Sequence, residues 1–138
     1  MSAENVERVI EGYERYNAGE RAPELWFWHE DAEYHASSTD PDSAVHRGID
    51  AIRRQFETWE QAYPDLRVEP LEVKDAGDHV FTWVRFVGHG ATSGVPIDME
   101  LAHVQAFRDG KVARLTEYPD RTEALAAVGL TEQRSPTR

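Results

Sequence analysis

The chain has 138 residues, and its 26 acidic and 15 basic side chains give a formal net charge of −11. This length predicts a single domain, and the negative charge disfavours nucleic acids and anionic membranes as partners, because both carry negatively charged phosphates. The chain contains no cysteine, which excludes disulfides, thiolate nucleophiles and thiolate metal sites. Hydrophobic residues make up 40% of the chain, a proportion typical of a globular protein.

No apolar segment approaches the roughly 20 residues of a membrane-spanning helix, and the first residues lack the basic and apolar regions of a signal peptide. We therefore expect a cytoplasmic protein. Residues 1–130 are predicted to form the single domain, and residues 131–138 are expected to be a disordered tail.

The first third of the chain alternates helical and extended patterns. Apolar residues at helical spacing predict a helix over residues 6–18, ended by Gly19. A dense aromatic cluster after Pro23 predicts a short buried helix that extends to Trp28. A short strand over residues 32–36 is expected next, followed by a mobile loop over residues 37–43.

The clearest helix runs from Gly48 to Tyr63, because apolar side chains recur along one face and Pro64 stops it. Turn residues divide the following segment into an antiparallel meander of strands. These strands are expected at residues 67–75, 79–88, 96–108 and 111–118. Asp120 with Glu123 forms a capping box that predicts a last helix ending at Gly129.

These elements predict an α+β fold in which a strongly curved antiparallel sheet forms a cone around the long helix, with two or three further helices. A sheet that bends around a helix without closing leaves a cavity between them. We expect a small-molecule site in that cavity.

Several local sequences carry a family resemblance. They are Tyr16-Asn17-Ala18-Gly19, Asp31-Ala32-Glu33-Tyr34, Gly48-Ile49-Asp50-Ala51-Ile52, Tyr63-Pro64-Asp65-Leu66 and Phe107-Arg108-Asp109-Gly110-Lys111-Val112. In this order the chain resembles, over residues 6–130, the SnoaL-like branch of the nuclear transport factor two-like superfamily. The resemblance implies the cone fold and a homodimer that pairs through the outer face of the sheet. It leaves the chemistry open, because the fold hosts ketosteroid isomerases, polyketide cyclases, epoxide hydrolases, dehydratases and members without known catalysis.

The acid–base candidates depend on the register of the last hairpin. A three-residue loop with a glycine bulge would pair His103 with Leu115 and Leu101 with Glu117, and would make His103 and Glu117 diagonal neighbours on one face. A two-residue Asp-Gly loop would pair Ala102 with Glu117 and turn His103 away. We prefer the bulged register, because it places Leu115 and Glu117 inside.

A carboxyl group in an apolar pocket beside an imidazole suits proton transfer near neutral pH, so His103 and Glu117 are the predicted catalytic pair. The alternative is a structural pair, in which His103 is a hydrogen-bonded core residue and Glu117 is paired with an arginine. Tyr34 is a third candidate that could donate a hydrogen bond into the cavity, or could be an ordinary core aromatic.

The resemblance also limits the reaction. The ketosteroid isomerases have a helix-one tyrosine where this chain has Gly12, and a catalytic base where it has Ala36. Both departures argue against steroid isomerisation. The limonene epoxide hydrolases hold a water with a tyrosine and an acidic residue, which Tyr34 and Glu117 match. Ala36 replaces their asparagine, and their Arg-x-Asp pair has no counterpart.

Large apolar side chains are expected either to line the cavity for a flat apolar ligand or to fill it. The candidates for this lining are Trp26, Trp28, Trp59, Tyr63, Trp83, Phe86, Leu101 and Leu115. The sequence thus predicts a cofactor-independent isomerase, cyclase or lyase acting on a small, mostly apolar molecule, with no metal and no cofactor. An epoxide hydrolase-like enzyme and a non-catalytic ligand-binding or dimerisation module are the alternatives.

Overall fold

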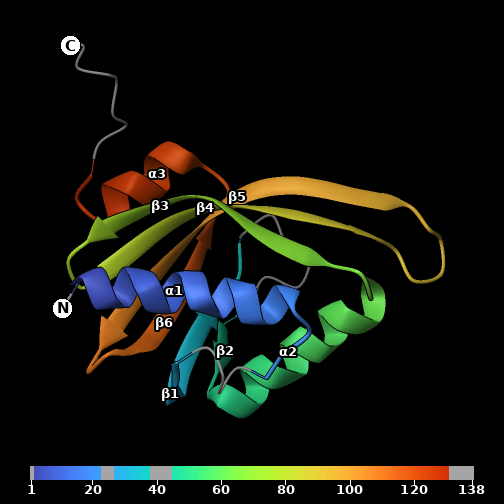
Figure 1. The fold of residues 1–138 in the computed structure, drawn as a ribbon, viewed down its shortest axis with the longest axis horizontal. Helices are drawn as coiled ribbons and strands as arrows, with labels where there is room; N and C mark the ends of the chain where they lie inside the picture. The colour runs from blue at the N-terminus through green and yellow to red at the C-terminus, as the bar shows by residue number, and fades with distance from the viewer. Residues whose placement is uncertain (1, 23–26, 38–44, 131–138) are drawn as a thin grey trace.

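The computed structural model describes residues 2–22, 27–37 and 45–130 (Figure 1). Trp26, the predicted tail and most of the predicted loop after Ser37 lie outside the described residues. In chain order the elements are α1 (Ser2–Asn17), β1 (Trp28–His35), β2 (Val45–Arg47), α2 (Ile49–Ala62), β3 (Arg67–Ala76), β4 (His79–His89), β5 (Pro96–Arg108), β6 (Lys111–Tyr118) and α3 (Arg121–Ala127). In the described part of the chain, no helix combines the length and the apolar character needed to cross a membrane.

The prediction that a short helix extends to Trp28 is wrong at the C-terminal end of that helix. Phe27 has a φ of 64°, a left-handed conformation that a right-handed helix does not accommodate. The backbone N–H of Val112 donates to the Phe27 carbonyl at 2.7 Å, and Trp28 begins a strand instead. The short strand β2 was not predicted. It pairs with the end of β1, where His46 lies opposite Tyr34.

The described strands form one sheet in the order β2-β1-β6-β5-β4-β3. The meander from β3 to β6 is antiparallel, as short connections require, and β2 pairs antiparallel with β1. The pairing of β1 with β6 is parallel, so the sheet is mixed rather than wholly antiparallel. No short turn joins these two strands, so local sequence does not determine their relative direction.

The two faces of the sheet carry different cores. On the inner face, Val9, Tyr13 and Tyr16 of α1 and Ile52 and Phe56 of α2 belong to the main hydrophobic cluster. On the outer face, α3 packs Ala124 and Leu125 against strands β4 and β5 (Figure 1). The sheet therefore separates an interior enclosed by α1 and α2 from a surface that α3 covers in part.

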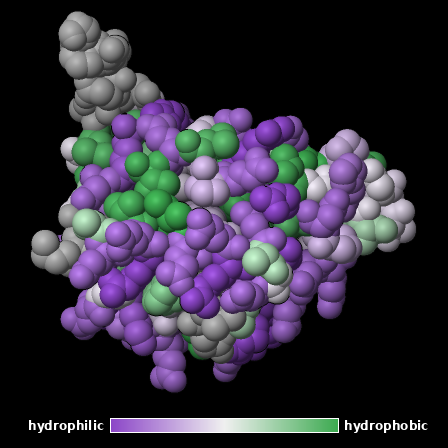
Figure 2. All heavy atoms as spheres, viewed as in Figure 1, coloured by the Kyte–Doolittle hydropathy of each residue, from purple (hydrophilic) through white to green (hydrophobic). Residues whose placement is uncertain are grey.

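The surface seen in Figure 2 is mainly hydrophilic, which agrees with the excess of acidic residues. The β4–β5 hairpin projects beyond the rest of the molecule and carries paler and hydrophobic side chains (Figures 1 and 2). Val95 and Met99 belong to the exposed large hydrophobic residues of the chain.

The register of the last hairpin differs from both predicted registers. Asp109 and Gly110 have φ angles of 55° and 77°, the pattern of a two-residue turn with left-handed central residues. Arg108 accordingly pairs with Lys111. A bulge one step along the hairpin then shifts the pairing, and His103 lies directly opposite Glu117. The preferred three-residue loop is wrong, but the bulge brings the two side chains to the same face by another route.

Candidate functional site

Glu117 of β6 is the centre of a buried group of hydrogen bonds. Its Oε2 accepts a hydrogen bond from the hydroxyl of Tyr34 on β1, and His103 Nε2 on β5 lies 3.3 Å from the same oxygen. Its Oε1 accepts from the backbone N–H of Ser37 at 3.0 Å. Strands β1 and β5 and the segment that follows β1 therefore direct polar hydrogens at one carboxylate.

The other side of the His103 ring faces α1. Tyr13 Oη lies 2.7 Å from His103 Nδ1, and Gln105 Nε2 donates to Tyr13 Oη at 3.3 Å. Gln105 and His103 share the inner face of β5, because they are two residues apart on one strand. The hydrogen bonds thus form one connected chain from Gln105 through Tyr13 and His103 to Glu117.

Aromatic rings surround the imidazole of His103. The Tyr13 ring is stacked on it with an interplanar angle of 14° and a centroid distance of 6.0 Å. Phe86 and Tyr34 approach it edge to face, at centroid distances of 5.7 and 6.3 Å. These contacts restrict rotation of the ring and hold its two nitrogens toward Tyr13 and Glu117.

The group is sealed from solvent. His103 is 4% exposed and Glu117 is 7% exposed. Burial by itself would raise the pKa of Glu117, but the bonds from His103, Tyr34 and Ser37 outweigh it and hold the pKa below its ordinary value of 4.5. Glu117 is therefore a carboxylate at neutral pH.

The two tyrosines have the opposite tendency. Burial raises the pKa of Tyr13 above its ordinary value, and the carboxylate of Glu117 adds to the same effect. Burial and Glu117 together raise the pKa of Tyr34 well above 10.0. Both phenols keep their protons at physiological pH, so both can act as hydrogen-bond donors in the site.

A small cavity adjoins this group inside the cone. Its volume is about 10 Å³, which is room for roughly one water molecule. It is lined by Tyr16, Tyr34, Phe56, Trp59, Val68, Phe86, His103 and Leu115. The aromatic rings therefore fill most of the interior, and a larger ligand would enter only if a ring such as that of Trp59 moved.

Some of the side chains predicted to line the cavity do line it. Trp59, Phe86 and Leu115 line the cavity, together with His103 and Tyr34. Leu101 is buried in the main core, and Tyr63 packs against that core, but neither lines the cavity. Trp26 lies outside the described residues.

Two of the predicted lining residues lie elsewhere. Trp83 was expected inside, but it lies next to the α3 cluster on the outer face, and its indole N–H donates to Glu100 at 2.7 Å. The alternation of side chains along β4 explains this correction, because inward Val84 and Phe86 leave Trp83 on the opposite face. Trp28 stacks on Tyr34, which separates it from the cavity, and it lines a groove outside the cone.

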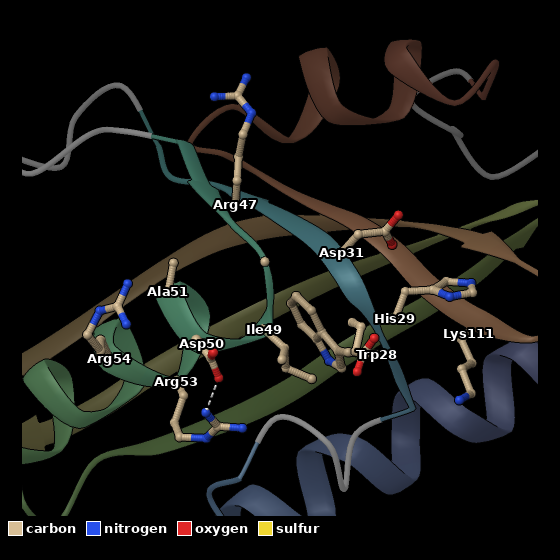
Figure 3. A pocket seen from close by; sticks show the side chains of 12 residues that line it. Trp28, His29, Asp31, Arg47, Ile49, Asp50, Ala51, Arg53, Arg54 and Lys111 are labelled. Carbon is tan, nitrogen blue, oxygen red and sulfur yellow. Dashed lines mark hydrogen bonds and ion pairs between the residues drawn. The ribbon is translucent and has the colours of Figure 1, made fainter.

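That outer groove has a volume of about 920 Å³ and lies at the start of α2 (Figure 3). Charged side chains of both signs surround it, and Asp50 accepts a hydrogen bond from Arg53 at 2.6 Å (Figure 3). The groove is large and polar, so it differs from the small aromatic cavity in both size and chemistry. Within the residues described, no group of three or more His, Asp or Glu is arranged to hold a metal ion.

Three members of the site were not predicted from the sequence: Tyr13, Ser37 and Gln105. Gln105 could have been found, because it lies two residues from His103 on one predicted strand. The resemblance to the ketosteroid isomerases placed their helix-one tyrosine at Gly12 of this chain. The structure shows that the next residue, Tyr13, contacts His103. The backbone contact of Ser37 has no signal in the sequence.

A comparison with models of protein families identifies a SnoaL-like domain over residues 6–115. The chain belongs to the SnoaL-like domain family. The predicted resemblance to SnoaL-like proteins is thereby confirmed. The predicted α+β fold is confirmed as well, since solved structures with a nuclear transport factor two-like fold resemble it. No curated protein gives a significant match to the sequence.

Solved structures share the fold at low sequence identity. Bal32a, from a soil-derived mobile gene cassette, has a TM-score of 0.75 and 22% identity over 84% of this chain and 88% of its own. A putative SnoaL-like polyketide cyclase from Jannaschia sp. CCS1 has a TM-score of 0.73 and 20% identity, covering 83% and 84% of the two chains. TerC, co-crystallised with polyporic acid, has a TM-score of 0.73 and 18% identity, covering 91% and 98%. At these identities the likeness extends to the fold alone.

Proposed function

We propose that the chain is a cofactor-independent acid–base enzyme of the isomerase, cyclase or lyase type, acting on a small, mostly apolar molecule inside the cone. The observation that carries this proposal is the meeting of two proton donors, Tyr34 Oη and His103 Nε2, at one oxygen of the buried carboxylate Glu117. Two donors converging on one point form a site for a developing oxyanion, and the adjacent carboxylate is a base.

The reaction follows from where a substrate oxygen would enter. The contact between His103 Nε2 and Glu117 Oε2 is long at 3.3 Å, so an incoming carbonyl oxygen can replace Oε2 as the acceptor for His103 and Tyr34. Glu117 Oε2 is then free to take a proton from the carbon next to the carbonyl. The C–H electron pair forms a C=C bond with the carbonyl carbon, and the carbonyl π pair moves onto the oxygen, which gives an enolate that the two donors stabilise. In an isomerase, Glu117 returns the proton to another carbon of the enolate. In a cyclase, the enolate carbon attacks a second carbonyl of the same molecule, and the proton on Glu117 goes to that carbonyl's oxygen. In a lyase, a group on the carbon beyond the enolate leaves with its bonding electrons and takes the proton from Glu117.

The substrate class follows from the lining. Ring faces and aliphatic side chains make up the cavity wall apart from His103 and the tyrosine hydroxyls. Such a wall favours a flat, apolar ligand with a single polar oxygen that reaches the donors. Because the cavity holds about 10 Å³, binding also requires the half-buried Trp59 to rotate away from Phe56 and Tyr34.

The small volume favours a second candidate, a non-catalytic module in which the rings fill the cone and the buried hydrogen bonds only fix the fold. The two candidates differ in whether Glu117 exchanges protons with a bound compound. The homodimer and the cytoplasmic location stay predictions.

A binding screen followed by an exchange assay separates the candidates. Small cyclic ketones, enones and hydroxyquinones are screened by thermal shift against the wild type, His103→Ala and Glu117→Gln. Each compound that binds is then incubated with protein in D₂O, and deuterium incorporation beside its carbonyl is followed by NMR. Exposed Glu57 supplies the matched control, Glu57→Gln, which makes the same change away from the site.

The enzyme predicts that Glu117→Gln keeps binding within a few-fold but loses deuterium incorporation by about 100-fold or more, whereas Glu57→Gln behaves as the wild type. Equal stabilisation of all variants with no incorporation indicates the binding module. Undiminished incorporation in both His103→Ala and Glu117→Gln removes these residues from the mechanism.

A further inference from the structure

The hydrogen bonds on the α1 side of His103 have a definite direction. The amide nitrogen of Gln105 has protons to donate and does not accept, so Tyr13 Oη accepts the 3.3 Å bond between them. Thr82 makes a second side-chain hydrogen bond to the phenol, which lowers the Tyr13 pKa as the bond from Gln105 does, so the oxygen accepts there too. The phenol has one proton of its own. Its shorter bond, 2.7 Å, leads to His103 Nδ1, so the Tyr13 proton is best placed on that bond.

A nitrogen that accepts a hydrogen bond carries no proton, so Nδ1 of His103 is bare and the proton of the neutral ring lies on Nε2. The opposite edge of the ring leads to the same assignment. Nε2 faces Oε2 of Glu117, and a carboxylate oxygen can only accept. The two ends of the chain of hydrogen bonds thus agree on one tautomer.

We propose that Gln105 and Tyr13 are positioning residues: the Gln105 amide directs the Tyr13 proton onto Nδ1 of His103, so that the ring offers its Nε2 proton toward Glu117. This inference rests on the proposed function, because it specifies which proton His103 offers at the oxyanion site. It adds residues of α1 and β5 that act through His103 rather than on the substrate.

The surroundings explain why such a device is needed. The described titratable groups that contact His103 are Tyr13 from α1, Tyr34 from β1 and Glu117 from β6. A carboxylate beside an imidazole favours the doubly protonated ring. A donor at Nδ1 opposes that second proton, and burial of Tyr13 and Gln105, 1% and 3% exposed, keeps water from taking their place. A neutral donor at Nε2 can then stabilise an enolate without first losing a proton to Glu117.

The tautomer is measured directly by ¹⁵N NMR of the histidine rings in the full chain at pH 7, with the His103 signals assigned by their loss in His103→Asn. The expected result is an unprotonated, hydrogen-bonded Nδ1 and a protonated Nε2. A protonated Nδ1 in the wild type overturns the proposal, whatever the variants do.

The role of Gln105 is tested by Gln105→Met, which keeps the side-chain length but removes the donor. The variant removes one of the two donors to Tyr13 Oη and leaves the contact with Thr82, so the Nδ1 signal is expected to shift in part toward that of a protonated nitrogen. Gln61→Met on the exposed face of α2 is the control and should leave the His103 signals unchanged. Wild-type His103 signals in folded Gln105→Met overturn the role of Gln105.

These readouts need no substrate, so they are independent of the proposed function. If wild-type protein exchanges no deuterium into any compound, the proposed enzyme fails while the tautomer result stands. If an exchange substrate is found, Gln105→Met is expected to lower kcat about tenfold and to leave KM within about twofold, because it changes the donor and not the cavity wall. An unchanged kcat contradicts the positioning role.

Discussion

The inner and outer faces of strands β4, β5 and β6 carry similar polar pairs in different surroundings. On the inner face, His103 and Glu117 meet with both side chains almost completely buried. On the outer face, Arg85 binds Asp98 through two hydrogen bonds, at 2.9 and 2.7 Å, with both side chains exposed to solvent. The outer geometry is the better of the two, but water can replace either partner there. Burial rather than bond geometry therefore makes the loss of a partner costly for stability in the inner pair.

The largest expected effect is that of Glu117→Leu. This change leaves the hydroxyl of Tyr34, Nε2 of His103 and the N–H of Ser37 buried without their acceptor, and should lower the free energy of unfolding by about 3 kcal/mol. Urea denaturation at pH 7 measures it. A loss below about 1 kcal/mol would mean that water enters the site and replaces the carboxylate.

Trp59→Ala should destabilise the chain by about 2 kcal/mol, less than for a fully buried tryptophan, because the ring is half-buried. The same change enlarges the cavity beside His103, so a small aromatic such as benzene or phenol should bind the variant and raise its melting temperature. Calorimetric titration checks the binding. Equal affinity of variant and wild type would show that Trp59 does not restrict the cavity.

The dependence of unfolding free energy on acid pH also distinguishes the buried pair from the exposed pair. The pKa of Glu117 is lowered in the folded state, so its contribution is present above about pH 4.5, the ordinary value, and is lost as pH falls through the folded pKa. Glu117→Gln should therefore flatten the decline in unfolding free energy below pH 4.5, as measured by urea denaturation between pH 2.5 and 7. Parallel curves for Glu117→Gln and the wild type would contradict this origin of the acid sensitivity.

Arg85→Ala should have the smallest effect. The pKa of Asp98 is lowered by its hydrogen bond to Arg85, but both groups are solvated and salt screens their attraction. The urea midpoint should scarcely move, and any difference should vanish in 1 M NaCl. A loss as large as that of Glu117→Leu would indicate that the outer face is covered in solution.

Local sequence patterns determined the helices at residues 6–18 and 48–63, the four-strand meander and the cap at Asp120, because hydrophobic periodicity and turn residues act over a few positions. The Asp120 side chain accepts from the N–H groups of Thr122 and Glu123, as the capping box predicts. The pattern of β6 also indicated that Leu115 and Glu117 face inward, which the structure confirms.

Tertiary structure alone decided the rest. The bulge that pairs His103 with Glu117, the parallel pairing of β1 with β6 and the approach of Tyr13 to His103 join segments far apart in the chain or depend on a one-residue shift. The volume left inside the cone depends on how several rings pack together, and no local pattern records it. Local sequence thus determines where the helices, strands and turns lie, whereas packing in three dimensions determines which face Trp83 and His103 take, which side chains touch and how much space remains between them.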